Sequence, residues 1–130
     1  MTFAESFHAW LDSSLSADIP DAVVAFSFNL YEESFVEGAK FGVELIGSNH
    51  FDATNSDWAC EEIWQPSVRS IHVPVVFSGE YWEGALDAVQ RLIQAKLASG
   101  DQASSAPTSR QGIGVGFVDG ELNVLWSRNK

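Results

Sequence analysis

Seven residues of types that bind metal ions or transfer protons lie between positions 50 and 72. They are His50, Asp52, Asp57, Cys60, Glu61, Glu62 and His72. None of them falls in a compact ligand spacing such as Cys-x-x-Cys or His-Glu-x-x-His, which places two ligands side by side. Asparagine, histidine and aspartate are also ordinary turn-forming residues. The spacing therefore predicts no metal site. It leaves open a small enzyme or ligand-binding domain that uses the region from His50 to His72.

Cys60 is the single cysteine of the chain, so an internal disulfide is impossible. A catalytic thiolate would need a basic partner, and only His50 and His72 are available in this region. Because Cys60 lies between Trp58 and Trp64, we expect it to be buried and inert. One free cysteine is typical of a reducing compartment, and the N-terminus has no signal-peptide pattern. We therefore expect a cytoplasmic protein.

Residues 57–64, the acidic–aromatic segment, combine three carboxylates with two tryptophans. On a helix, Trp58 would neighbour Glu61 and Glu62, whereas on a strand Glu62 would share a face with Trp58 and Trp64. Aromatic anchors surrounded by carboxylates suit a basic protein partner. Alternatively, both tryptophans belong to the core and the acids are merely solvated. The sequence pattern leaves both interpretations open.

The net charge of −11 is concentrated in the first half of the chain. Residues 1–68 contain 12 Asp and Glu against Lys40 alone, and residues 69–130 contain 6 acids against 6 bases. An acidic surface repels nucleic acid phosphates and anionic lipids, and attracts basic proteins. We therefore expect no nucleic acid partner and no membrane partner. Acidity that serves only solubility is the alternative explanation.

Two amphipathic helices must position these residues. The apolar residues of the first helix are spaced three or four apart from Phe3 to Leu15, and Thr2 and Glu5 form a capping box. The second helix lies near residues 80–99, between a cap at Ser78 and a terminating Gly100. Its apolar stripe consists of Trp82, Ala85, Leu86, Val89, Ile93 and Leu97.

Alternating apolar residues predict strands over residues 23–31 and 35–46, joined by a two-residue loop at Glu32–Glu33. That loop fixes a register with a bulge at Gly38. The register pairs Leu30 with Phe35, Phe26 with Ala39, Val24 with Phe41 and Phe28 with Glu37. The apolar run at residues 71–77, interrupted by Pro74, predicts an edge strand or an extended connector.

The C-terminal region predicts a hairpin with a type I′ turn at Asp119–Gly120. Its register pairs Phe117 with Leu122, Val115 with Val124 and Ile113 with Trp126. The apolar face formed by these residues is expected to pack on the helix near 80–99. Residues 102–111 are small and polar, and are expected to form a mobile surface loop.

These elements predict an α+β fold, in which an antiparallel sheet built from hairpins is covered by the N-terminal helix and the helix near 80–99. At 130 residues, of which 45% are hydrophobic, residues 1–130 fit a single domain. No run approaches the roughly 20 apolar residues of a membrane span.

At scattered positions, the sequence resembles small bacterial immunity-type proteins, which neutralise polymorphic toxins by binding them. The resembling residues are Asp57-Trp58-Ala59-Cys60-Glu61-Glu62, Pro66, Arg69, Pro74, Trp82-Glu83 and the final Gly-Val-Gly-Phe-Val-Asp-Gly hairpin. The resemblance implies an α+β cytoplasmic binding protein without a cofactor. It transfers no particular functional residue.

We therefore expect a non-catalytic acidic binding protein, an inhibitor of a basic protein such as a toxin. Its partner-binding residues are expected to gather on one surface, with Trp58 or Trp64 partly exposed as an anchor. The expected acids are Glu32, Glu33, Glu37, Glu44, Asp57, Glu61 and Glu62. The alternative is the enzyme or ligand-binding domain of the His50–His72 region. The sequence does not indicate the oligomeric state.

Overall fold

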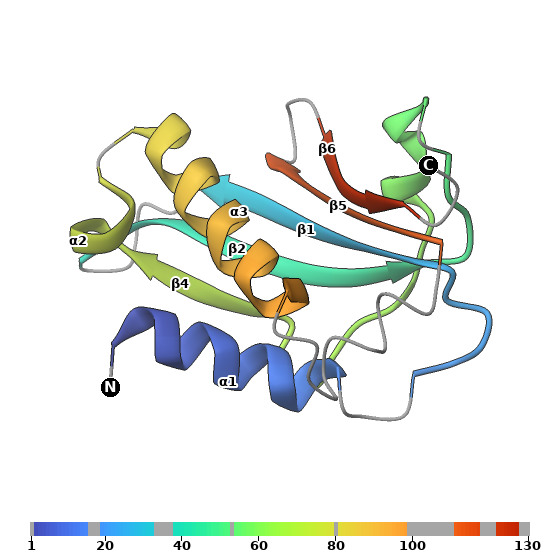
Figure 1. Ribbon diagram of the computed structural model, residues 1–130, viewed down its shortest axis with the longest axis horizontal. Helices are drawn as coiled ribbons and strands as arrows, with labels where there is room; N and C mark the ends of the chain where they lie inside the picture. The colour runs from blue at the N-terminus through green and yellow to red at the C-terminus, as the bar shows by residue number, and fades with distance from the viewer. Residues whose placement is uncertain are drawn as a thin grey trace.

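The computed structural model describes residues 2–15, 19–32, 38–52, 54–79, 81–98, 111–117 and 122–127. The predicted α+β fold is confirmed: helices pack on one six-stranded, mostly antiparallel sheet (Figure 1). The expected mobile loop at 102–111 falls almost entirely outside the described residues. So do Gly100 and the Asp119–Gly120 turn.

Two helices cover one face of the sheet. Helix α1 spans Phe3–Leu15, as predicted, and helix α3 spans Trp82–Ala98. The capping box forms, since the Glu5 amide donates to Thr2 Oγ1 (3.2 Å) and the Thr2 amide donates to Glu5 Oε1 (3.0 Å). In Figure 1, α3 crosses in front of β1 and β2, while α1 runs beside β4. Both helices contribute their buried residues to one core.

Strands β1 (Ala25–Glu32) and β2 (Ala39–Ser48) form the centre of the sheet. They are antiparallel, but the predicted register is wrong: Leu30 pairs with Val43, and Phe28 pairs with Leu45 instead of Glu37. The connection runs from Glu32 to Ala39 and is longer than the predicted two-residue turn. Gly38, with φ of 83°, ends this connection. The apolar alternation was right, whereas the loop length that sets the register was not.

Strand β5 (Gly112–Phe117) pairs in parallel with β1, an arrangement that hairpins alone do not predict. Strand β6 (Leu122–Ser127) completes the predicted C-terminal hairpin. Its register shifts at Ile113/Gly114, so Val115 pairs with Asn123 and not with Val124. The hairpin therefore lacks the wholly apolar face that we expected.

The other edge of β2 carries two short strands, β3 (Glu62–Trp64) and β4 (Ser70–Pro74). Residues 75–77, predicted as part of an edge strand or an extended connector, instead lie in the short helix α2 (Val75–Ser78). Ser78, the predicted cap of the second helix, is thus the last residue of α2, and α3 begins only at Trp82. The sheet order is β3-β2-β1-β5-β6, and β4 pairs with β2 on the same edge as β3.

The two faces of the sheet differ in composition. The helix-covered face holds the core, in which Phe28, Val43 and Val115 meet Phe7 of α1 and Val89 of α3. Val89 is fully buried and Leu86 is partly buried in this core, as the stripe predicted. The opposite face, here called the open face, carries many small and polar residues beside Tyr31 and Ile46. Its β1, β2 and β5 members include Ser27, Asn29, Gly42, Glu44, Gly114 and Gly116.

Candidate functional site

The acidic–aromatic segment forms the 3-10 helix η1 (Ser56–Cys60) followed by β3. Asn55 caps η1, because its side-chain oxygen accepts from the Asp57 amide at 3.0 Å. The segment is held to the sheet by Ser48, whose hydroxyl donates to the carbonyl oxygen of Trp58 at 2.7 Å. Asp57 and Glu61 are exposed on this segment. Neither carboxylate forms an ion pair with another described residue.

Trp58 is a core residue, with 1% of its surface exposed. Its ring meets Phe51 edge-on at 5.1 Å between centroids and covers Gly114 on the open face. Its indole Nε1 finds no hydrogen-bond acceptor in the described part of the chain. In this conformation Trp58 cannot serve as the exposed anchor. For this tryptophan the core interpretation is correct.

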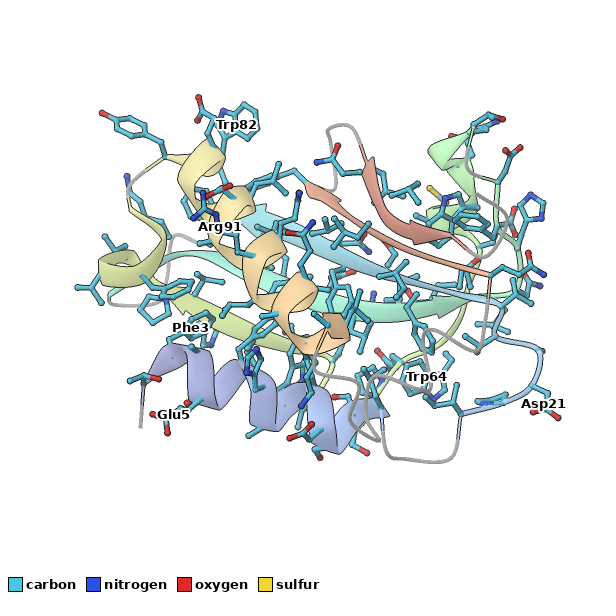
Figure 2. The ribbon with its side chains drawn as sticks, viewed as in Figure 1. Phe3, Glu5, Asp21, Trp64, Trp82 and Arg91 are labelled. Carbon is cyan, nitrogen blue, oxygen red and sulfur yellow. The ribbon has the colours of Figure 1, made fainter. Side chains whose placement is uncertain are left out.

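Trp64 is half-buried and lies on the helix-covered side of the sheet, edge-on to Phe26 at 5.9 Å. A register shift in β2 places Trp64 opposite Gly47 and Glu62 opposite Ser48. Glu62 and Trp64 therefore do not share a face, as a regular strand would require. Figure 2 shows Trp64 beside the end of α1.

Glu62 and Glu44 are brought together by Arg69. Arg69 Nη2 donates to Glu62 Oε1 at 2.8 Å and to Glu44 Oε2 at 3.0 Å, and its Nη1 donates to Gln65 Oε1 at 2.7 Å. The hydrogen bonds from Arg69 hold the pKa of Glu62 below its usual value. The same contacts with Glu62 raise the pKa of Arg69 further above its usual range. Both groups therefore stay charged at neutral pH, and neither is suited to proton transfer.

The contacts of Arg69 continue across the open face as a chain of hydrogen bonds. Asn29 Nδ2 donates to Glu44 Oε2 at 3.3 Å, and Ser27 Oγ donates to Asn29 Oδ1 at 2.6 Å. Ser27 is fully buried and its proton is engaged, so it is not an activated nucleophile. The chain orders side chains on the open face, with two carboxylates against one guanidinium.

The remaining predicted acids lie elsewhere. Glu32 ends β1, whereas η1 lies near Ala25, where β1 begins. At about 3.3 Å per residue, the eight residues of β1 separate these ends by about 23 Å. Glu33 and Glu37 lie outside the described residues. Among the described acids of the predicted set, Glu32 therefore lies apart from a group that consists of Asp57, Glu61, Glu62 and Glu44.

The structure separates the candidate ligands of the His50–His72 region. His50 lies two residues beyond Ser48, the end of β2, and its amide donates to Ser48 Oγ. His72 pairs with Gly42, which is six residues, or about 20 Å, from Ser48 along that strand. Asp52 accepts hydrogen bonds from Thr54, which lower the pKa of Asp52. In the part of the chain that is described, no three His, Cys, Asp or Glu side chains are grouped to hold a metal ion.

Cys60 is exposed, contrary to our expectation that it is buried. It ends η1, a tight helix that turns Trp58 inward and leaves Cys60 toward solvent.

A small apolar cavity of about 10 Å³ lies between α1, α3 and the sheet, lined by Leu11, Phe28 and Ile93 among others. Its volume is barely that of one water molecule, so it does not accommodate a metabolite.

Two exposed aromatic residues were not among the predicted site residues. Tyr81 is 76% exposed and Trp82 is 52% exposed, although the helical pattern placed Trp82 on the buried stripe. Trp82 is the first residue of α3, so no preceding turn of the helix covers it. Position at a helix end, next to a second aromatic, is the sequence signal that would have identified it.

Comparison of the chain with protein-family models, curated proteins and solved structures returns no match. The resemblance to immunity-type proteins therefore stays a prediction. Among the helices that the structure describes, none combines the length and the apolar character required to cross a membrane.

Proposed function

We propose that this chain is a non-catalytic acidic protein that binds a basic protein partner. The observation that carries the proposal is the pairing of charges on the folded chain. Arg69, Arg91 and Lys96 each form an ion pair with a carboxylate. By contrast, several exposed carboxylates form no ion pair within the described ranges: Asp21, Glu32, Asp57, Glu61 and Glu83.

Among the described residues, this imbalance leaves an excess of exposed negative charge. Such an excess raises the rate of encounter with cationic proteins and disfavours anionic partners such as nucleic acids. The group around Arg69 supports the proposal, because two carboxylates are fixed by one guanidinium and keep an excess negative charge. A fixed carboxylate loses less conformational entropy when a partner's cation binds it.

A toxin is the kind of basic partner that we propose, on the resemblance to immunity-type proteins described above. An inhibitor of this kind needs only a complementary surface, with neither a cofactor nor a catalytic group. The wide separation of His50 from His72 gives the alternative enzyme no assembled site in the described chain. We accordingly propose binding alone as the function.

The test is co-purification of the tagged chain from its native host at low ionic strength, followed by a wash at about 1 M salt, where the screening length is about 3 Å. We expect a basic protein in equimolar amounts that the wash releases. An acidic partner, a nucleic acid, or a complex indifferent to salt would contradict the proposal. If a toxin gene lies beside this gene, co-expression of the two should restore growth that the toxin alone abolishes.

A further inference from the structure

The exposed aromatic residues at the start of α3 form a defined surface. Tyr81, Trp82 and the half-buried Phe117 make its apolar part, here called the aromatic end of the molecule. In Figure 2, Trp82 projects from the first turn of α3 at the top of the view, whereas Trp64 lies in the lower half. An exposed tryptophan beside an exposed tyrosine is unusual on a surface without a partner, since both bury large areas on binding.

Trp82 is held in place although half of it faces solvent. Its ring meets Phe117 edge-on at 5.9 Å, and Phe117 in turn meets Phe41 edge-on at 5.7 Å. The Tyr81 carbonyl accepts from the Ala85 amide at 3.3 Å, which ties the backbone of Tyr81 to the first turn of α3. The rings of Trp82 and Phe117 are therefore held in position before any partner arrives, which lowers the entropy cost of binding.

Two exposed carboxylates neighbour these residues, one across the sheet and one along the chain. Glu32 pairs in register with Phe41, the residue on which Phe117 packs, and Glu83 directly follows Trp82. Both are exposed, and neither forms an ion pair with another described residue. Among the described cations, Lys40 is exposed and precedes Phe41 in β2, and Arg91 of α3 is paired with Asp87. The charge at the aromatic end is thus predominantly negative.

We infer that the aromatic end is the docking surface for an arginine-bearing segment of the basic partner; this inference rests on the proposed function. A guanidinium stacks on tryptophan and tyrosine faces and pairs with carboxylates through two parallel hydrogen bonds. A lysine ammonium lacks the planar shape for both contacts. The acids near η1 then act at a distance by attracting the partner, whereas the aromatic end makes the contact.

The experiment measures the affinity of the full chain for nona-arginine and nona-lysine peptides by calorimetry. The wild-type chain should bind nona-arginine more tightly than nona-lysine. Tyr81→Ser and the double variant Glu32→Gln/Glu83→Gln should each weaken nona-arginine binding about tenfold, the usual effect of an interface anchor. The control Asp57→Asn/Glu61→Gln makes the same change in charge at the other end of the sheet, and should weaken binding less than about twofold.

Tyr81→Ser is the decisive aromatic variant, because a side chain that is 76% exposed contributes little to folding. Trp82→Ala is informative only if its unfolding midpoint matches that of the wild type, since Trp82 packs on Phe117. Equal losses for the two charge-matched pairs, with no effect of Tyr81→Ser, would overturn the docking surface and leave the proposed function intact. Failure of the wild-type chain to bind either peptide would overturn both.

Discussion

The indole of Trp58 lies directly over Gly114: a Cβ atom added to Gly114 would sit 3.0 Å from Cζ2 of Trp58. The two residues come from η1 and β5, which are distant in sequence, and they meet on the open face of the sheet. The missing side chain of Gly114 thus gives Trp58 its buried position. This explains why the alternating glycines of β5 accompany an aromatic residue for which the sequence left a core and a surface position both open.

Gly114→Ala should therefore displace Trp58. The added methyl group would also meet Leu122 at 2.9 Å, so two side chains must move. We expect a loss of about 1–3 kcal/mol in the free energy of unfolding, as for other overpacked cores. Urea unfolding measures the loss, and near-ultraviolet circular dichroism reports the displaced indole.

Gly84→Ala is the matched control, because Gly84 is exposed within α3. Alanine is the better helix former there, so the free energy of unfolding should rise by about 0.5–1 kcal/mol. If both substitutions changed stability in the same direction and by the same amount, the close packing of Trp58 on Gly114 would not be the cause.

Arg69→Met should make the free energy of unfolding less dependent on pH. The pKa of Glu62 is lowered in the folded chain, so its stabilising contribution is fully present above the unfolded value near 4.5. That contribution is lost as the pH falls through the lower folded pKa. The stability difference between wild type and Arg69→Met should therefore be large at pH 7 and should shrink toward pH 3. Urea unfolding at both pH values measures it.

Arg91→Met provides the comparison for an exposed ion pair. Arg91 Nε lies 3.0 Å from Asp87 Oδ2, but the side chains of Arg91 and Asp87 are 77% and 63% exposed. We expect Arg91→Met to change the free energy of unfolding by less than about 0.5 kcal/mol at any pH. A pH-independent effect of Arg69→Met, or one no larger than that of Arg91→Met, would mean that the contacts of Arg69 do not stabilise the fold.

Thr2→Ala tests the capping box of α1. The variant removes the hydroxyl oxygen that accepts from the Glu5 amide, and should cost about 1 kcal/mol of stability. Ser13→Ala, on the exposed side of the same helix, should have no effect or a slight stabilising effect. Thermal unfolding of the two variants distinguishes loss of the cap from a general change in helix propensity.

Ile93→Ala tests the packing of α3 on the sheet. Ile93 is 2% exposed, and its truncation should cost about 2–5 kcal/mol through lost contacts and a cavity. Gln94→Ala, one position further and exposed, should leave the unfolding midpoint nearly unchanged. Similar midpoints for both variants would show that α3 is not packed as described.

Local pattern predicted the helices well because their determinants are local. The spacing of apolar residues and the capping box gave the limits of α1, and the stripe that includes Val89 gave the buried side of α3. Pairing over long distances was not predictable in this way. The register of β1 and β2 depends on the length of their connection, and the parallel pairing of β5 with β1 depends on the whole topology.

The candidate site shows the same limit. Arg69 joins Glu44 and Glu62 across a sheet edge, a contact that neither sequence spacing nor composition indicates. The exposure of Trp82 follows from its place at the very start of α3, and the burial of Trp58 follows from a glycine 56 positions away. Residue types therefore identified the chemistry of the surface, while the fold decided which aromatic residues face solvent.

The association rate constant of the co-purified partner, measured at about 50 mM and about 500 mM salt, tests the central claim most directly. At the higher concentration the screening length is a fraction of its value at the lower one, so attraction between separated charges is largely removed. The proposed acidic binding protein predicts an association rate constant that falls at least about tenfold, with a much smaller change in the dissociation rate constant. Equal association rate constants at the two salt concentrations would contradict it.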